Sequence, residues 1–238
     1  MFEAIPKNRL LADLPKVEWS QLRPISEGVD LPLGKLLLDE GNAVDYLYFP
    51  QTGVISTVTT FEDGTHAESA TTGCEGVASI GTLLGDRHAA FRNVVQIPGY
   101  AIRIPARAIR GGGLDLPALS RGLQAYTRVF VIQVMQSVAC NSKHNVKQRC
   151  ARWLLTCHDR VEGDEFAITQ EFLADTLGVS RTAVGVVTRR FTRAGWFSHR
   201  RGRVTIKDRH ALRQAACECY GRVRGEYDRL LPGSFFPH

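Results

Sequence analysis

The chain has 238 residues, of which 44% are hydrophobic and 23% charged, and its formal net charge is +6. This composition is typical of a globular protein, and the length allows one large domain or two ordinary ones. No apolar run reaches the roughly 18–20 residues that a membrane-spanning helix needs. Residues 1–16 are interrupted by Pro6, Lys7 and Asp13 and lack the apolar core of a signal peptide. We therefore expect a cytoplasmic protein that does not contact the membrane.

The positive charge is concentrated in the C-terminal part of the chain. Residues 1–142 contain 12 Lys or Arg and 14 Asp or Glu, a net charge of −2. Residues 143–238 contain 18 Lys or Arg and 10 Asp or Glu, a net charge of +8. This asymmetry favours a C-terminal unit that faces a polyanion. Basic surfaces are also common without such a role, so the charge by itself leaves the function open.

Residues from about Leu31 to Ile104 alternate between short strand-like runs and turn-forming residues. The runs are rich in β-branched and aromatic residues, and Gly, Pro, Asn and Asp separate them. Asp63-Gly64 is a typical hairpin turn. The strand-like runs cover 35–38, 46–49, 54–60, 94–97 and 100–104. We predict an α+β protein with an N-terminal antiparallel β-roll of the jelly-roll type, an effector-type domain over residues 1–113.

The apolar pattern becomes helical after residues 111–113. Five apolar residues follow one another at spacings of 3, 4, 3 and 4, namely Leu116, Leu119, Leu123, Tyr126 and Phe130. This spacing is typical of a coiled-coil seam, although a helix packed on its own domain can also show it. Residues between Val129 and Val138 make the other faces apolar too, so the helix needs partners on more than one side. We predict that the five residues form a dimer seam, that residues 114–142 are a dimerisation helix with its hinge, and that the hinge lies near 141–145.

Residues 168–207 contain the most specific pattern of the sequence. Thr169 and Ser180 are good N-caps, and Gly178 suits the left-handed backbone that ends a helix. The apolar residues between the caps have the spacing to fill the angle between two helices; they are Leu173, Leu177, Val179, Val184 and Val187. Two capped helices with a short glycine turn form a helix-turn-helix, which we place in a DNA-binding domain of residues 143–238. The alternative is an ordinary helical hairpin in an all-helical core.

The residues after the second helix predict a wing. Residues 196–198 and 203–206 have strand patterns, and Arg200-Arg201-Gly202 suits the turn between them. A helix fits the major groove, where side chains of its first turn meet base edges, while basic side chains on a wing meet phosphates. The candidate DNA-binding residues are Thr169, Ser180, Arg181, Thr182, Gly185, Arg189, Arg193, Arg200, Arg201 and Arg203.

A β-roll followed by a long helix and a winged helix-turn-helix resembles the Crp/Fnr family of bacterial transcription regulators. The resemblance extends from about Leu31 to Leu212 and is strongest at 168–184 and 203–206. It implies a non-enzymatic homodimer that binds a palindromic site in double-stranded DNA. It also implies contact with RNA polymerase and control by an effector, here unidentified, that binds the β-roll.

The sequence departs from this family at two sites. In cyclic-AMP-responsive members the recognition helix presents Arg, Glu and Arg to the bases, whereas here Arg181 is followed by Thr182 and Val186 at those positions. We therefore expect a different operator. Cyclic-nucleotide members also hold their ligand with a Gly-Glu pair and an Arg-Ser or Arg-Thr pair, which are both missing from the corresponding stretch of this sequence, residues 74–92. The remaining candidates for effector binding are Glu75, Gly76, Arg87 and Arg92, and we do not expect a cyclic nucleotide.

The six cysteines are scattered and do not suggest a disulfide framework. No cysteine precedes Cys74, so we do not expect the N-terminal iron–sulfur cluster of other family members. Cys217-Glu218-Cys219 is spaced too closely for a usual zinc site. Haem ligation by His66 or His88 has no supporting motif. We therefore expect no cofactor and no metal, and an inert buried thiol at Cys74.

Two other functions stay open. A signalling adaptor could bind a small ligand without binding DNA, although the basic C-terminal part and Arg181 argue against it. A metal enzyme on the β-barrel would need clustered ligands on strands; His66 and Glu68 alternate on one predicted strand, but a third ligand of suitable spacing is missing from the sequence.

Overall fold

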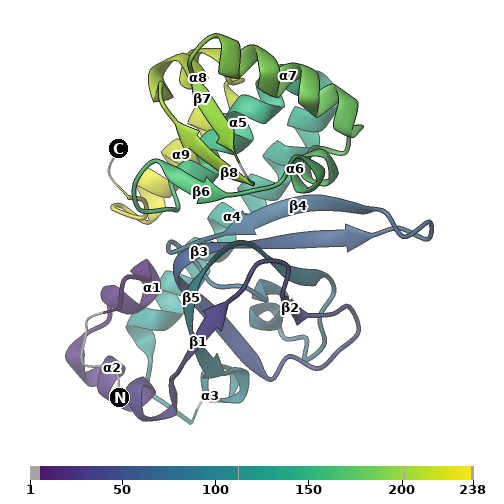
Figure 1. The fold of residues 1–238 in the computed structure, drawn as a ribbon. Helices are drawn as coiled ribbons and strands as arrows, with labels where there is room; N and C mark the ends of the chain where they lie inside the picture. The colour runs from purple at the N-terminus through teal and green to yellow at the C-terminus, as the bar shows by residue number, and fades with distance from the viewer. Residues whose placement is uncertain (1–5, 112, 201, 237–238) are drawn as a thin grey trace.

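The computed structural model describes residues 6–111, 113–200 and 202–236, except for the side chains of Thr82 and Leu84. A strand-rich N-terminal domain and a helical C-terminal domain are connected by the long helix α4 (Pro117–Lys143) (Figure 1). Helices and antiparallel sheets combine as the predicted α+β class requires, which confirms that prediction. Among the helices of the described residues, none is both long and apolar enough to cross a bilayer.

The N-terminal domain is built on one curled antiparallel sheet with the strand order β1-β5-β3-β4, and β2 also pairs with β5. Its strands are β1 (Glu27–Leu31), β2 (Leu36–Leu38), β3 (Tyr46–Thr60), β4 (His66–Thr72) and β5 (Arg92–Pro105). The short helices around the sheet are α1 (Arg9–Ala12), α2 (Lys16–Leu22), η1 (Arg23–Ile25), η2 (Ile80–Leu84) and α3 (Ala106–Arg110). The sheet and these helices enclose a core to which α4 contributes one face.

Strands β3 and β5 are longer than the sequence predicted. The expected turns at 50–53 and 98–99 are irregularities inside the two paired strands, where the register shifts. The backbones approach so closely there that a Cβ on Gly53 would lie 2.6 Å from the carbonyl oxygen of Ile97. Gly53 also has a φ of +82°, which favours glycine. The prediction of separate short strands was wrong because these residues serve a bulge and a close backbone crossing rather than a chain reversal.

The C-terminal domain contains the helix-turn-helix. Its elements are α5 (Val146–His158), β6 (Glu165–Ala167), α6 (Gln170–Leu177), α7 (Arg181–Arg193), β7 (Phe197–Arg200), β8 (Arg203–Ile206) and α8 (Arg209–Ala215). The three strands pair antiparallel in the order β6-β8-β7. Aliphatic side chains of α5, α6 and α7 pack with Phe191 and Phe197 in a core of their own. Trp153 on α5 lies in the same core.

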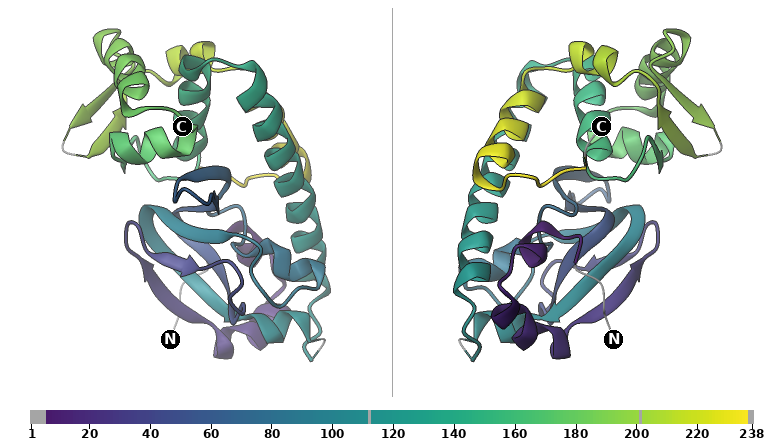
Figure 2. Two further views of the ribbon diagram at one scale, coloured as in Figure 1. Left: turned by 90° about the vertical axis from the view of Figure 1, so that its right-hand side faces the viewer. Right: turned by 90° about the vertical axis from the view of Figure 1, so that its left-hand side faces the viewer.

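The last helix, α9 (Cys219–Leu230), leaves this domain and runs back along α4 (Figure 2). Tyr227 and Leu231 enter the core of the N-terminal domain together with Leu119 and Tyr126 of α4. Residues 143–238, which we expected to form one unit, therefore contribute to both cores.

The predicted seam of α4 faces the core of the N-terminal domain. Leu119, Leu123 and Tyr126 are buried inside the chain, and Leu116 and Phe130 pack against the same core. Leu119, Leu123 and Tyr126 are covered by their own domain, so the prediction that they form the dimer seam was wrong, whereas Leu116 and Phe130 are partly buried. The heptad spacing is present in α4, but its apolar residues pack against the N-terminal domain of the same chain rather than against a second copy. The face that the chain leaves exposed carries Val131, Met135 and Val138 instead.

The break between α4 and α5 falls inside the predicted hinge. Helix α4 ends at Lys143, and His144 has an extended backbone. Asn145 then begins α5 with a capping box, in which its side chain accepts from the Gln148 N–H and the Gln148 side chain accepts from the Asn145 N–H. The chain direction therefore changes at two extended residues, His144 and Asn145, between the two helices.

A buried ion pair connects the two domains. Arg160, just after α5, donates from Nε to Glu75 Oε1 at 2.9 Å, and its Nη2 donates to Gln133 of α4 at 3.2 Å. The two charged side chains are 2% and 0% exposed. The ring of Phe235 lies 5.2 Å from the guanidinium carbon. Burial alone would lower the pKa of Arg160, but the carboxylates of Glu75 and Asp159 and the Tyr227 hydroxyl together outweigh burial and raise the pKa.

We predict that Glu75→Gln destabilises the protein strongly, because it leaves the Arg160 cation buried without a counter-ion. Breaking one partner of a buried pair costs about 3–5 kcal/mol, which urea unfolding would measure. Glu27→Gln is the control, since Glu27 forms a half-exposed pair with Arg103; its loss should cost less than about 1 kcal/mol. Equal effects of the two substitutions would contradict the prediction.

Candidate nucleic-acid interface

Helices α6 and α7 begin, and α6 ends, where the sequence predicted. Thr169 Oγ1 accepts from the Phe172 N–H at 3.1 Å, and Ser180 Oγ accepts from the Ala183 N–H at 3.2 Å. Gly178 ends α6 in the left-handed conformation, with φ 59° and ψ 43°. Because each cap satisfies a backbone group that the helix cannot, the turn between the helices is fixed by local chemistry.

The angle between the two helices is filled as predicted. Leu173, Leu177, Val184 and Val187 are buried in the core of the domain, and Val179 packs against it. This packing determines which face of α7 points outward. That face carries Arg181, Thr182, Val186, Arg189, Arg190 and Arg193, all exposed. Figure 1 shows α7 at the edge of the domain, on the side away from the N-terminal sheet.

All charged residues of α7 are arginines. Arg181 contacts the carboxylate of Glu171 at 3.5 Å, but both side chains are about two-thirds exposed, at 68% and 64%. An exposed ion pair of this kind contributes little free energy in water, so Arg181 can leave Glu171 for another anion such as a phosphate. Gly185 lies beneath the Arg189 guanidinium, since a Cβ there would be 3.1 Å from Arg189 Nη1. We expected Gly185 to permit approach to DNA or another helix; no such helix lies within 4 Å of that Cβ position among the described residues.

The wing forms from β7 and β8, with Gly202 at a φ of +74° in the turn. Arg200 is exposed at the end of β7, and Arg201 lies outside the described residues. Arg203 pairs with Glu165 on β6, so its charge is partly neutralised within the sheet. Of the predicted wing residues, Arg200 is therefore the described one that most clearly offers a free cation.

The structure adds residues that the sequence analysis missed. A hollow of about 330 Å³ between the two helices and the wing is lined by Gln170, Thr188, Arg189, Thr192, Arg193 and His199. Gln170, Thr188, Thr192 and His199 were not among the candidates. His199 could not have been found from the sequence, since its place depends on the wing folding back to the Ile168 carbonyl, which lies 3.1 Å from its Nε2.

The comparisons with known proteins agree with this geometry. Residues 148–215 match the family model of the Crp-like helix-turn-helix domain. The chain is similar to the structure of FixK2 from Bradyrhizobium japonicum, with a TM-score of 0.68 at 15% identity over 81% of this chain and 98% of that one. It is also similar to a CRP-family transcriptional regulator from Thermus thermophilus, with a TM-score of 0.67 at 18% identity over 79% and 96% of the two chains. The comparison with curated proteins gives no match.

This chain has the fold of the Crp/Fnr regulators. Its C-terminal part is a Crp-like helix-turn-helix domain, and the predicted resemblance is confirmed. The c-di-GMP-responsive global regulator CLP from Xanthomonas campestris shares the fold, with a TM-score of 0.60 at 15% identity over 77% of this chain and 94% of that one.

The four residues predicted to bind an effector in the β-roll do not form one site. Glu75 is buried against Arg160, and Gly76 packs so tightly on the Tyr126 ring that a Cβ would overlap it. Arg92 pairs with Asp39 at 2.8 Å. The prediction was wrong for Glu75 and Gly76 because the Crp-like domain and α4 occupy the space that a ligand would need.

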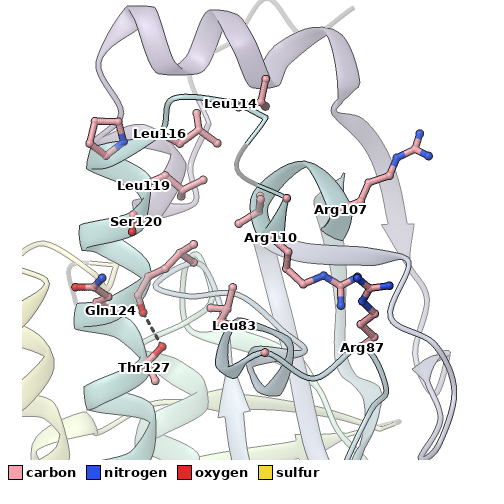
Figure 3. A pocket seen from close by; sticks show the side chains of 15 residues that line it. Leu83, Arg87, Arg107, Arg110, Leu114, Leu116, Leu119, Ser120, Gln124 and Thr127 are labelled. Atoms are coloured by element: carbon pink, nitrogen blue, oxygen red, sulfur yellow. Dashed lines mark hydrogen bonds between the residues drawn. The ribbon is translucent and has the colours of Figure 1, made fainter.

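Arg87 lies elsewhere, at a cavity of about 980 Å³ between α3, the loop after η2 and the N-terminal half of α4. Figure 3 shows the guanidinium groups of Arg87 and Arg110 close together at one end of this cavity, whereas Arg107 points away. The other lining residues are mostly apolar, and none is acidic. A separate cavity of about 240 Å³ opens inside the roll beside Phe130 and Val134 of α4 and is lined almost entirely by apolar groups.

The side chains considered for metal or redox chemistry have different surroundings. Burial, and then the charge of Glu75, raises the pKa of the Cys74 thiol to about 12, which keeps it protonated and unreactive. Glu68 accepts hydrogen bonds from Ser56, Gln96 and Trp153, and burial raises its pKa. His66 is exposed and bonds Thr60. His66 and Glu68 therefore do not converge on a metal.

Folding brings together a candidate metal site that the sequence analysis set aside. We set Cys217 and Cys219 aside because of their spacing, but folding brings Cys140 and His144 of α4 to them, with the four ligand atoms within 4.8 Å of one another. Spacing along the chain could not show ligands that come from a helix more than seventy residues earlier.

We predict that Ser180→Ala destabilises the Crp-like domain by about 1 kcal/mol, because the Ala183 N–H loses its cap. Urea or thermal unfolding measures the change. Ser120→Ala on the exposed side of α4 is the control and should have no effect or a slightly stabilising one, since alanine favours helices. The prediction fails if the two variants unfold alike.

Proposed function

We propose that this protein is a sequence-specific DNA-binding transcription regulator that acts as a homodimer on a palindromic site. The observation that carries the proposal is the outward face of α7, where a capped helix in a Crp-like domain exposes four arginines. An acidic surface would be repelled by phosphates; this face has the opposite charge and the width to enter a major groove. Chromosomal DNA as the target implies action in the cytoplasm.

The position of each side chain along α7 suggests its role. Arg181 and Thr182 occupy the first turn, which in helix-turn-helix proteins meets base edges. Arg181 would donate two hydrogen bonds to guanine, and the exposed Val186, one turn later, would contact a thymine methyl group. Arg189, Arg190 and Arg193 lie farther along and would contact phosphates, as would Arg200 on the wing.

The dimer would form through the exposed stripe of α4. Gln124, Arg128, Val131, Met135 and Val138 follow one another at spacings of 4, 3, 4 and 3, and the last three are 47%, 67% and 67% exposed. This heptad pattern is shifted from the buried one and suits a parallel pair of helices. Two copies related by a two-fold axis would present their recognition helices to two half-sites, which is why a palindrome is expected.

Control of DNA binding would come from the N-terminal domain, through an effector whose identity is open. The cavity that contains Arg87 and Arg110 is a candidate for an anionic ligand with an apolar body. RNA polymerase would be the further partner of an activator of this kind.

We predict that selection from random DNA enriches a palindrome, and that Arg181→Ala weakens binding to it by about 1–3 kcal/mol while relaxing the preference at one position of each half-site. Arg193→Ala should weaken binding to all sequences and reduce the salt dependence by about 0.9 per lost phosphate contact. Fluorescence anisotropy at several salt concentrations measures both effects.

Arg222→Ala is the matched control, because it removes one exposed arginine from α9, away from α7. Its affinity should stay close to that of the parent protein. If no sequence is enriched, or if Arg181→Ala and Arg222→Ala behave alike, the proposal is overturned and a DNA-independent adaptor becomes the better description.

We predict that Met135→Lys converts a dimer into a monomer, because it places a cation in the middle of the apolar stripe at both copies. Analytical ultracentrifugation measures the mass. Val17→Lys on α2 is the control, since Val17 is equally exposed at 68% but lies off the stripe. A monomeric parent protein, or a dimer that Met135→Lys leaves intact, would contradict the dimer model.

A further inference from the structure

Four side chains with metal-binding atoms meet where α4 ends. Cys140 lies in the last turn of α4 and His144 is its C-cap, one helical turn later. Cys217 lies between α8 and α9, and Cys219 is the first residue of α9. Their three sulfur atoms and one imidazole nitrogen all lie within 4.8 Å of one another. The cysteines are at most 4% exposed, and the His144 side chain is 12% exposed.

The distances fit a single tetrahedral ion. Cys140 Sγ and Cys217 Sγ are 3.5 Å apart, and Cys219 Sγ lies 3.5 Å from His144 Nδ1. With the usual zinc–sulfur and zinc–nitrogen bond lengths, neighbouring ligands of a tetrahedron are about 3.6–3.8 Å apart. The cysteines of a four-iron cluster each bind a different iron, and those of a two-iron cluster are divided between two irons, so both need a wider arrangement. The cluster is therefore the size of one ion.

Two neighbouring side chains, Glu218 and Gln136, are placed as the groups that surround a metal site usually are. His144 directs Nδ1 toward the sulfurs while its Nε2 lies 3.1 Å from the Glu218 carboxylate. A carboxylate behind a ligating histidine fixes its orientation and tautomer. Gln136, one turn before Cys140, points Nε2 at Cys219 Sγ at 3.0 Å, and such a donor stabilises a metal-bound sulfur.

We propose that Cys140, His144, Cys217 and Cys219 bind one zinc ion or a similar soft divalent cation. Four protein ligands close a tetrahedron and leave no position for a substrate, so the role is structural. The proposal does not depend on DNA binding.

The position of the ligands indicates what the ion would do. Two ligands come from α4 and two from the segment that follows α8, and α8 packs against α5 in the Crp-like domain. The ion would therefore tie the far side of that domain to α4 across the break at His144. It would restrict the rotation of the domain about this break.

Metal analysis of the full-length protein tests the proposal. The protein is produced with zinc in the medium, purified with a phosphine reductant and dialysed against metal-free buffer. We expect one zinc ion per chain, and a loss to background in Cys217→Ser and in His144→Ala. Cys74→Ala is the matched control, because Cys74 and Cys217 are both 4% exposed; this variant should keep its zinc.

A second measurement does not depend on the variants folding. The parent protein is stripped with a chelator and titrated with Co²⁺, and a tetrahedral site with three thiolates gives intense visible absorption that saturates at one ion per chain. Zinc should displace the cobalt and raise the unfolding temperature of the stripped protein. The proposal is overturned if the reduced parent protein binds neither ion stoichiometrically. It is also overturned if both ligand variants keep zinc, or if the zinc-supplied protein, isolated without reductant, contains a Cys140–Cys217 disulfide.

Discussion

The arrangement of the two domains depends on one buried ion pair. Arg160 and Glu75 are both almost fully buried, so each needs the other to avoid an uncompensated charge. Gly73 permits the approach, because a Cβ there would lie 2.7 Å from the Arg160 side chain, and its N–H donates to both oxygens of Glu75. Gln133 of α4 and the ring of Phe235 complete the surroundings. Four segments distant in the sequence therefore meet at one guanidinium, and the orientation of the Crp-like domain is set there.

Helix α4 extends from this ion pair along the N-terminal domain, and its faces have different surroundings. One heptad stripe is buried in the N-terminal core, and a second, shifted stripe is exposed. The helix ends at Lys143, and the chain turns into α5 at His144 and Asn145. The Cys/His cluster lies at that break, and the Arg160–Glu75 pair joins the segment after α5 to the N-terminal domain. Any movement of the recognition helices relative to α4 has to accommodate both.

Local signals explain which predictions succeeded. Capping residues, glycine at a left-handed position and apolar spacing act within a few residues, so Thr169, Gly178 and Ser180 located α6 and α7 correctly. The seam and the effector site failed for the opposite reason. Leu119 and Tyr126 have a heptad spacing whichever surface covers them, and Glu75 has the same sequence neighbours whether it meets a ligand or Arg160. The surface that covers Leu119 and Tyr126, and the group that Glu75 contacts, depend on packing between distant segments.

Short-range periodicity, capping and charge were enough to predict the fold class, the two helices of the helix-turn-helix and their exposed arginines, because each of these signals acts between near neighbours. The folded chain was needed to show which stripe of α4 is free, that the charge of Arg203 is shared with Glu165, and that Cys217 and Cys219 meet Cys140 and His144. Those contacts join residues far apart in the chain. These contacts form only when whole helices and strands pack together, and the spacing of residues along the sequence does not predict that packing.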